Sequence, residues 1–82
     1  GVMHEKEIIE LILERDEKGL SLLQTYYSPL MRYIVSPILK DKREQEECIS
    51  EITMKIWNNI QFFDSTKGSW NAWITAISRN AH

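Results

Sequence analysis

Aromatic, cationic and amide side chains gather in the last third of the sequence, where together they could bind single-stranded nucleic acid. The aromatic residues are Phe62, Phe63, Trp70 and Trp73, preceded by Trp57, and the polar ones are Lys67, Ser69, Asn71, Arg79 and Asn80. In such sites rings stack on bases, cations contact phosphates and amides pair with base edges. The alternative is a core that closes the fold, which we favour for Trp57 and Trp73. Phe62 or Phe63, and Trp70, flank a polar loop and are less committed to a core.

A second candidate surface is a row of carboxylates that recurs at helical spacing. Glu44, Glu47 and Glu51 would share one stripe of a helix, with Ser50 alongside. A solvated helix face is the simpler explanation of such a row. However, like charges at this spacing repel one another and destabilise the helix. A basic partner surface would explain why they are present.

Enzymatic and metal-binding sites are not indicated. The sequence has no paired histidine and carboxylate, no nucleophile elbow and no glycine-rich phosphate loop. His4, His82 and Cys48 do not have the spacing of a zinc site. Cys48 is interpreted as a small helix residue at the core boundary, and we expect neither catalysis nor a cofactor.

Helical periodicity throughout predicts an all-α fold, a small bundle of about four helices with a loop before the last one. The first helix is expected at about 4–16, with Ile8, Ile9, Leu11, Ile12 and Leu13 on its apolar face, and the second at about 17–39. The second should bury one stripe, kink near Ser28 and end near Pro37 because proline removes a backbone donor. That predicted stripe consists of Leu20, Leu23, Tyr27, Leu30, Ile34 and Ile38.

The third and fourth helices carry the candidate site residues, and each begins with a capping residue. The third should start after Asp41, which can form a capping box with Glu44, and its inner stripe comprises Ile49, Ile52, Ile56 and Ile60. Residues 61–69 are expected to form a loop, with Ser69 as the N-cap of the fourth helix. The inner face of that helix comprises Trp70, Trp73, Ile74 and Ile77. Asp16 is the candidate cap of the second helix.

Length and composition limit the chain to one ordered domain. It has 82 residues, 43% hydrophobic and 27% charged, with net charge −2 and a pI near 5.6. This composition argues against disorder, and the charge does not by itself indicate a nucleic-acid binder. One cysteine suits a reducing, cytoplasmic setting, and no apolar run approaches the roughly 20 residues of a membrane span. Residues 1–3 are expected to be an expression remnant with a disordered start, and 4–82 the domain.

The motifs resemble a known family. Asp64, Lys67-Gly68-Ser69-Trp70, Ala72-Trp73-Ile74, Ile77 and Arg79-Asn80 resemble the segment "fD…GsF.aWL..IarN" of bacterial sigma factors. Upstream, Glu46 to Trp57 is similar to the family's "eDlvQevflklW", and Tyr26 to Leu30 to its "yy.pL". The resemblance covers the whole chain and is specific to region two of the extracytoplasmic-function group. It implies a sigma region two type of bundle, truncated in its last helix, with a second, DNA-binding domain downstream.

The resemblance implies that the third helix binds the clamp helices of the largest subunit of core RNA polymerase. The residues implied in polymerase binding are Glu47, Ser50, Glu51, Met54 and Asn58. Two of them depart from the family pattern. Glu47 stands where aspartate is usual, and Ser50 replaces the usual glutamine, which would weaken or redistribute polymerase contacts.

The resemblance also implies that the loop traps a base flipped from the minus-ten promoter element, on the non-template strand. The residues implied in DNA binding are Phe63, Asp64, Lys67, Gly68, Ser69, Trp70, Arg79 and Asn80. Trp70 replaces the usual phenylalanine. The implied function is a cytoplasmic sigma-factor module that recruits polymerase and melts the promoter, controlled by an anti-sigma factor.

The alternative interpretation is a helical protein-interaction or anti-sigma-like domain without nucleic-acid binding. The net acidity and the acidic first helix fit that alternative slightly better.

Overall fold

Helices make up most of the computed structural model, which describes residues 2–81, with side chains from residue 4 on. They are α1 (Val2–Leu13), α2 (Lys18–Val35), α3 (Lys42–Asn58) and α4 (Trp70–Asn80), with a 3-10 turn, η1 (Ile60–Phe62), after α3. No strand occurs within this described range, which confirms the all-α prediction. Gly1 and His82 lie outside it. Val2 and Met3 belong to α1 and not to a disordered start, and the expectation that residues 1–3 are an expression remnant stays a prediction.

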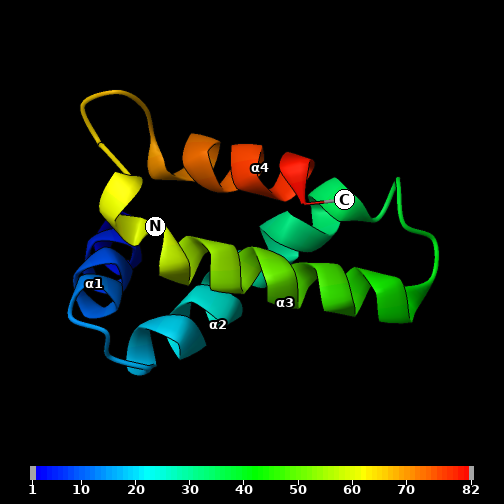
Figure 1. Cartoon of the computed structure of the whole chain (residues 1–82), viewed down its shortest axis with the longest axis horizontal. Helices are drawn as coiled ribbons and strands as arrows, with labels where there is room; N and C mark the ends of the chain where they lie inside the picture. The colour runs from blue at the N-terminus through cyan, green and yellow to red at the C-terminus, as the bar shows by residue number, and fades with distance from the viewer. Residues whose placement is uncertain (1, 82) are drawn as a thin grey trace.

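Helix α2 is the central element of the bundle, because it contacts α1, α3 and α4. In Figure 1, α3 lies across the front with α4 beside it, while α2 passes behind them and α1 lies at one end. The loop between η1 and α4 projects at the same end as α1. This arrangement places the candidate site residues on α3, on α4 and on the loop that joins them.

The buried stripe of α2 follows a strict four-residue step, through Leu23, Tyr27, Met31 and Val35. The predicted stripe was therefore wrong in its second half, since Leu30 and Ile34 are only half-buried and Ile38 is 55% exposed. A ridge of residues at i and i+4 packs between neighbouring helices, and α2 has helices on several sides. The helix ends at Val35, before Pro37, so Ile38 belongs to a surface turn. Pro29 lies within the continuous helix, and the kink near Ser28 stays a prediction.

The inner stripe predicted for α3 is confirmed, since Ile49, Ile52, Ile56 and Ile60 are all buried. The N-cap is also confirmed. The Asp41 carboxylate accepts hydrogen bonds from the backbone N–H of Arg43 at 2.7 Å and of Glu44 at 3.4 Å. Such a cap satisfies N–H groups that have no partner inside the helix.

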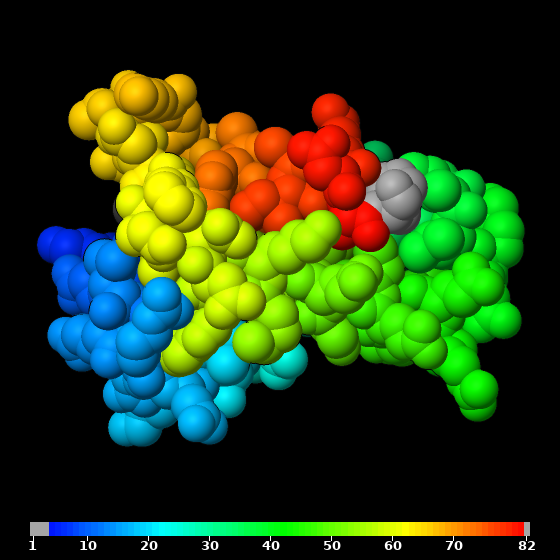
Figure 2. All heavy atoms as spheres, in the orientation of Figure 1, coloured from blue at the N-terminus to red at the C-terminus, as the bar shows by residue number. Residues whose placement is uncertain are grey.

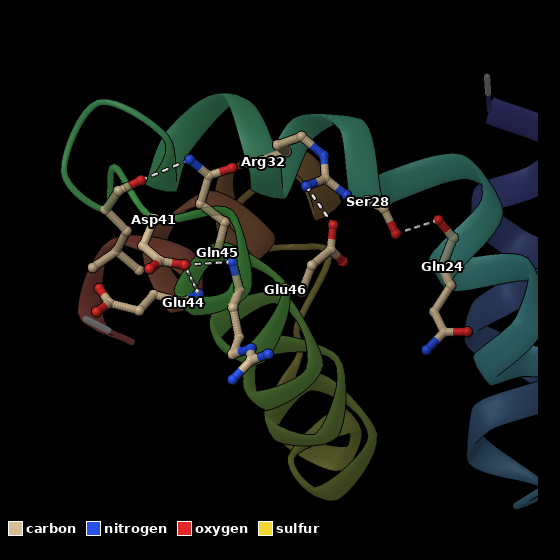
Figure 3. A network of polar contacts seen from close by, with 9 residues as sticks. Gln24, Ser28, Arg32, Asp41, Glu44, Gln45 and Glu46 are labelled. Atoms are coloured by element: carbon tan, nitrogen blue, oxygen red, sulfur yellow. Dashed lines mark hydrogen bonds and ion pairs between the residues drawn. The ribbon is translucent and has the colours of Figure 1, made fainter.

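Two side-chain contacts hold the start of α3 against α2 and the preceding turn. Arg32 of α2 forms an ion pair with Glu46 at 2.8 Å, and the Gln45 amide donates to the carbonyl of Leu39 at 2.7 Å. Figure 3 shows Arg32 reaching across to Glu46 beside the capped end of α3. The same view shows the Ser28 hydroxyl donating to the Gln24 carbonyl within α2, just before Pro29. These contacts fix the end of α3 that precedes the acidic row.

The turn between α1 and α2 is tied to the far end of α3 by Arg15. This residue has φ 59°, a left-handed conformation that usually favours glycine at a helix C-terminus. The N–H of Arg15 bonds the carbonyl of Ile12, and that of Asp16 bonds the carbonyl of Leu11. The guanidinium donates to the Trp57 carbonyl at 2.5 Å and lies 5.2 Å from the centre of its ring. The N-cap position of α2 is Glu17, one residue after the predicted cap Asp16, although the Asp16 carboxylate accepts from the N–H of Lys18 at 2.9 Å.

Candidate nucleic-acid and partner interfaces

The loop between η1 and α4 is shaped by hydrogen bonds to Asp64. Its carboxylate accepts from the backbone N–H of Thr66 at 2.9 Å and from the Thr66 hydroxyl at 2.6 Å, while its carbonyl accepts from the N–H of Lys67. Such bonds from an aspartate to a residue two positions on define a tight turn. The hydroxyl bond, and then the N–H bond, lower the pKa of Asp64. Asp64 therefore organises the loop.

A pocket of about 270 Å³ opens between this loop and the start of α4, and we call it the loop pocket. Its lining residues are Phe62, Phe63, Asp64, Lys67, Gly68, Ser69, Ala72 and Trp73. The lining includes five of the eight residues predicted to bind DNA, Phe63, Asp64, Lys67, Gly68 and Ser69. In Figure 2 the loop forms a projection beside α4, so the pocket lies at an edge of the molecule.

Trp70 does not lie on this surface. It is 1% exposed and packs edge-on against Tyr27 and Phe63, with ring centres 6.0 and 5.2 Å away. Its placement among the strand-binding residues is corrected here, because a fully buried ring cannot stack on a base. Helix α4 begins at Trp70 and is capped by the Ser69 hydroxyl, which lies 3.1 Å from the Ala72 N–H.

The indole N–H of Trp70 is buried and makes no hydrogen bond of standard geometry. Burial and, to a lesser extent, the Glu5 carboxylate raise the pKa of Tyr27. The Trp70 indole N–H lies near the Tyr27 hydroxyl and partly opposes this rise. The rise leaves the Tyr27 hydroxyl neutral at physiological pH, as suits a core residue.

The exposed aromatic ring at the loop pocket is Phe62, which is 70% exposed. Its neighbour Phe63 is half-buried and contacts Trp70 and Trp73, with a ring-centre distance of 5.4 Å to the latter. Phe63 is the residue predicted for the site and Trp73 was predicted to lie mainly in the core, yet Trp73 also lines the pocket. The two consecutive phenylalanines gave no periodic signal to tell which one faces solvent, because the 3-10 turn ends between them.

The remaining predicted DNA-binding residues lie further along α4. Asn80 lines a second pocket of about 310 Å³, which we call the helix pocket, and Arg79 is exposed but lines neither pocket. The helix pocket is bounded by Lys55, Asn59, Phe62, Trp73, Ile77 and Asn80. Lys55, Asn59 and Ile77 were not predicted as site residues. These three residues come together only because the end of α3 packs alongside α4.

The row of carboxylates on α3 forms an exposed surface, which we call the acidic face. Its members are Glu44, Glu47, Ser50, Glu51, Met54 and Asn58. All are exposed, including Met54 at 46%, and the structure pairs none of these carboxylates with a cation within the described residues. The unpaired carboxylates could attract a basic partner, and Met54 adds an apolar contact. None of these residues lines either pocket, so the acidic face and the two pockets are separate surfaces.

Other chemistry finds no support among the described residues. They contain no cluster of three or more histidine, cysteine, aspartate or glutamate side chains that could hold a metal ion. Cys48 is 5% exposed, and burial, followed by the Glu51 carboxylate, raises the pKa of its thiol, which disfavours the reactive thiolate. Within the same part of the chain, no helix is long and apolar enough to cross a membrane.

Comparison with known proteins gives a consistent family signal. The family model described as sigma-70 region 2 matches residues 23–82. The chain is 38% identical over 45 residues, 55% of its length, to the ECF RNA polymerase sigma factor SigK of Mycobacterium tuberculosis. It is 26% identical over 66 residues, 80% of its length, to the ECF RNA polymerase sigma factor RpoE of Cereibacter sphaeroides.

These matches cover only part of each relative, 24% of SigK and 36% of RpoE. The chain therefore corresponds to about a quarter to a third of the curated proteins that it resembles. No solved structure matches the chain significantly.

Proposed function

The chain belongs to the sigma-70 region 2 family, and on that premise we propose that it binds core RNA polymerase and holds a melted promoter strand. The observation that carries this proposal is the loop pocket, which collects an exposed ring, a cation and an organised loop at one edge of the bundle. The family match favours this function over a helical interaction domain without nucleic-acid binding.

The loop pocket offers the groups that a flipped base requires. Extruding a base from a duplex costs a few kcal/mol, which the pocket must offset by stacking and polar contacts. Phe62 and Trp73 supply aromatic surface, and the Lys67 ammonium has no ion-pair partner within the described residues, so it is available to a phosphate. The turn held by Asp64 keeps this arrangement in place before the strand arrives. The module would thus stabilise a separated strand without making or breaking a covalent bond.

The acidic face is proposed to bind the clamp helices of the largest polymerase subunit. Glu47 and Glu51 lie on the same exposed side of α3, at the positions of the acidic contacts that the resemblance implies. Ser50 lies between them and is also exposed, but its short hydroxyl reaches less far than the usual glutamine amide. An anti-sigma factor that covers either surface would silence the module.

Co-purification with core polymerase tests the proposal. Glu51→Lys should reduce the amount of core polymerase retained by at least tenfold, because it reverses a charge at the centre of the acidic face. Glu7→Lys makes the same change of net charge at an exposed position on α1 and serves as the matched control. Equal losses in the two variants, or no retention by the unmodified protein, would contradict the proposed polymerase contact.

The DNA part of the proposal needs a separate measurement. Lys67→Ala should reduce the opening of promoter DNA, measured with a fluorescent base analogue, while retention of core polymerase stays unchanged. A variant that lost both properties together would argue against two independent surfaces.

A further inference from the structure

Positive charge is concentrated where α2 turns into α3. Residues 32–43 carry one carboxylate, Asp41, and four cations, Arg32, Lys40, Lys42 and Arg43. This stretch therefore has a net charge of +3 in a chain whose total is −2. The turn lies at the end of the molecule opposite to the loop before α4 (Figure 1). None of the four cations lines the loop pocket or the helix pocket.

A pocket of about 440 Å³ opens beside this turn, and we call it the corner pocket. Its lining residues are Ser28, Pro29, Arg32, Tyr33, Ser36 and Gln45. The Gln45 amide donates to the Leu39 carbonyl at 2.7 Å, so the turn is held next to the pocket (Figure 3). Lys42 lies three residues before Gln45 on the same face of α3, which brings a second cation close to Arg32.

The polar groups of the corner pocket can bind a carboxylate. One terminal nitrogen of Arg32 donates to the Glu46 carboxylate at 2.8 Å, and the other N–H groups of the guanidinium make no bond within the described residues. The two side chains of this pair are 40% and 52% exposed, so the pair is weak and a second carboxylate can reach Arg32. The Lys42 ammonium has no ion-pair partner in the same part of the chain.

Apolar surface accompanies these charges. The Tyr33 residue on α2 is 77% exposed, and Ile38 on the following turn is 55% exposed. Pro29 is also exposed and lines the corner pocket together with Tyr33. Tyrosine and arginine are the residue types that often dominate the binding energy of protein interfaces. The corner therefore combines an aromatic ring with cations.

The mixture of charges at this corner favours a polypeptide over a nucleic acid. A nucleic acid carries a phosphate charge at every nucleotide. The carboxylates of Asp41, Glu44 and Glu46 lie at the same end of α3 and would repel such a regular row of charges. A polypeptide segment can instead place one or two carboxylates at the cations and an apolar side chain at the ring.

We propose that the corner pocket and the cations around it form a docking surface for an acidic segment of a partner polypeptide. A carboxylate of this segment binds Arg32 in competition with Glu46, and a neighbouring apolar side chain packs on Tyr33 and Pro29. The surface differs from the acidic face, which attracts partners of the opposite charge. The inference does not depend on polymerase binding or on strand binding.

The test is titration of the full chain with a short peptide, followed by NMR. The probe peptide alternates aspartate with leucine or phenylalanine, and the control peptide carries asparagine in place of each aspartate. The acidic peptide should shift the signals of the Gln45 side-chain amide, the Arg32 Nε–H and the Tyr33 ring. The asparagine peptide should leave these signals unchanged.

Substitutions at the corner identify the groups that bind the peptide. Arg32→Gln and Tyr33→Ala should each weaken binding of the acidic peptide by about five- to tenfold. Glu46→Gln should strengthen binding by about two- to threefold, because it removes the competing carboxylate. A purely structural ion pair would not produce this gain. Lys18→Gln and Tyr26→Ala make matching changes at exposed positions elsewhere on α2 and serve as controls.

Circular dichroism shows whether each variant keeps its fold, and the outcomes are decisive. Equal shifts with the asparagine peptide, or an equal loss of binding in Lys18→Gln, would overturn the proposal because neither depends on Arg32. Shifts of the corner signals by a DNA duplex, without shifts by the acidic peptide, would assign the surface to nucleic acid instead. The absence of any shift with the acidic peptide would also overturn it. None of these results bears on polymerase retention or promoter opening, which test the proposed function separately.

Discussion

Asp64 illustrates how a single exposed side chain shapes the candidate site. Its carboxylate accepts hydrogen bonds from the hydroxyl and the N–H of Thr66, so its negative charge is stabilised by groups of the loop itself. A negative group that contacted DNA directly would repel phosphates. The geometry therefore favours a positioning role for Asp64, and leaves Lys67 and Phe62 as the loop residues proposed to contact a strand.

The pH dependence of the loop follows from these bonds. Because the pKa of Asp64 is lowered in the folded chain from its ordinary 3.8, the turn is fully stabilised above that value and loosens as the pH falls below it. NMR titration of the Asp64 carboxyl should show this lowered pKa. Thr66→Val removes the hydroxyl that contributes most to the lowering of the Asp64 pKa, so the pKa should move back toward 3.8. An unchanged pKa in Thr66→Val would show that the hydroxyl bond is absent in solution.

Phe62 and Trp70 should separate binding from stability. Phe62→Ala should change the free energy of unfolding by less than about 0.5 kcal/mol, because the ring is 70% exposed, but weaken strand binding by about 1–3 kcal/mol. Trp70→Ala should cost about 3–5 kcal/mol of stability, because that ring is 1% exposed. Urea denaturation and fluorescence anisotropy measure the two quantities. A Trp70→Phe variant that kept its stability but lost strand binding would contradict the buried placement.

At this scale the sequence predicted which kinds of residue gather at the loop, but not their exposure. Ser69 and Asp41 were predicted as caps because their side chains act on adjacent backbone groups, and both were confirmed. Trp70 was predicted both on the inner face of the fourth helix and among the DNA-binding residues, and its burial confirms only the first prediction. Whether an aromatic ring at the first turn of a helix points inward depends on tertiary contacts, here with Tyr27 and Phe63.

Among the elements, the contact between α1 and α2 depends on a glycine. A Cβ atom added at Gly19 would lie 2.8 Å from a side-chain carbon of Ile12 and 3.1 Å from its backbone nitrogen. Contacts this short require the helices to move apart. Gly19 therefore permits the close approach that buries Ile8 and Ile12.

Substitution of Gly19 tests this packing. Alanine normally stabilises a helix by about 1 kcal/mol relative to glycine. Here Gly19→Ala should instead destabilise the fold by about 1–3 kcal/mol through overpacking. The control is Gly68→Ala, where an added Cβ meets nothing within 4 Å and stability should not change. A higher unfolding midpoint for Gly19→Ala would mean that α1 can move away from α2 without loss of stability.

The starts of α3 and α4 were predicted correctly from their caps, whereas α1 and α2 end earlier than predicted, at Leu13 and Val35. The α3 stripe followed from its isoleucines, whereas the α2 stripe shifted to Met31 and Val35 because α2 packs against three helices rather than one. The tertiary role of Arg15 was not predicted. Its left-handed backbone and its bond to the Trp57 carbonyl depend on how α3 lies against that turn, which local sequence does not specify.

For the molecule as a whole, the distribution of charge matters more than the net value of −2. The carboxylates of the acidic face are unpaired within the described chain, while Lys55, Lys67 and Arg79 lie near the two pockets or at the end of α4. Partners of opposite charge can therefore bind the same small domain at different surfaces.

The salt dependence of strand binding should show that only a few phosphates are contacted. Two or three cations predict a slope of about −1.4 to −2.1 when the logarithm of the strand affinity is plotted against that of the salt concentration. Lys67→Ala should reduce the magnitude of this slope by about 0.7, whereas Lys42→Ala should leave it unchanged. Titrations over a range of salt concentrations measure the slope. A slope several times steeper would indicate phosphate contacts beyond the two pockets.

The buried Cys48 gives the molecule an internal reporter of helix docking. Its sulfur lies 4.0 Å from the carbonyl of Ala81, just beyond the end of α4, and only 5% of the residue is exposed. An alkylating reagent can therefore react with the Cys48 thiol only when α4 separates from α3. The ratio of its rate with the native chain to its rate with a free thiol gives the fraction of time that the helix is open. Such a rate, followed while a strand occupies the pockets beside α4, would show whether ligand binding locks the helix in place.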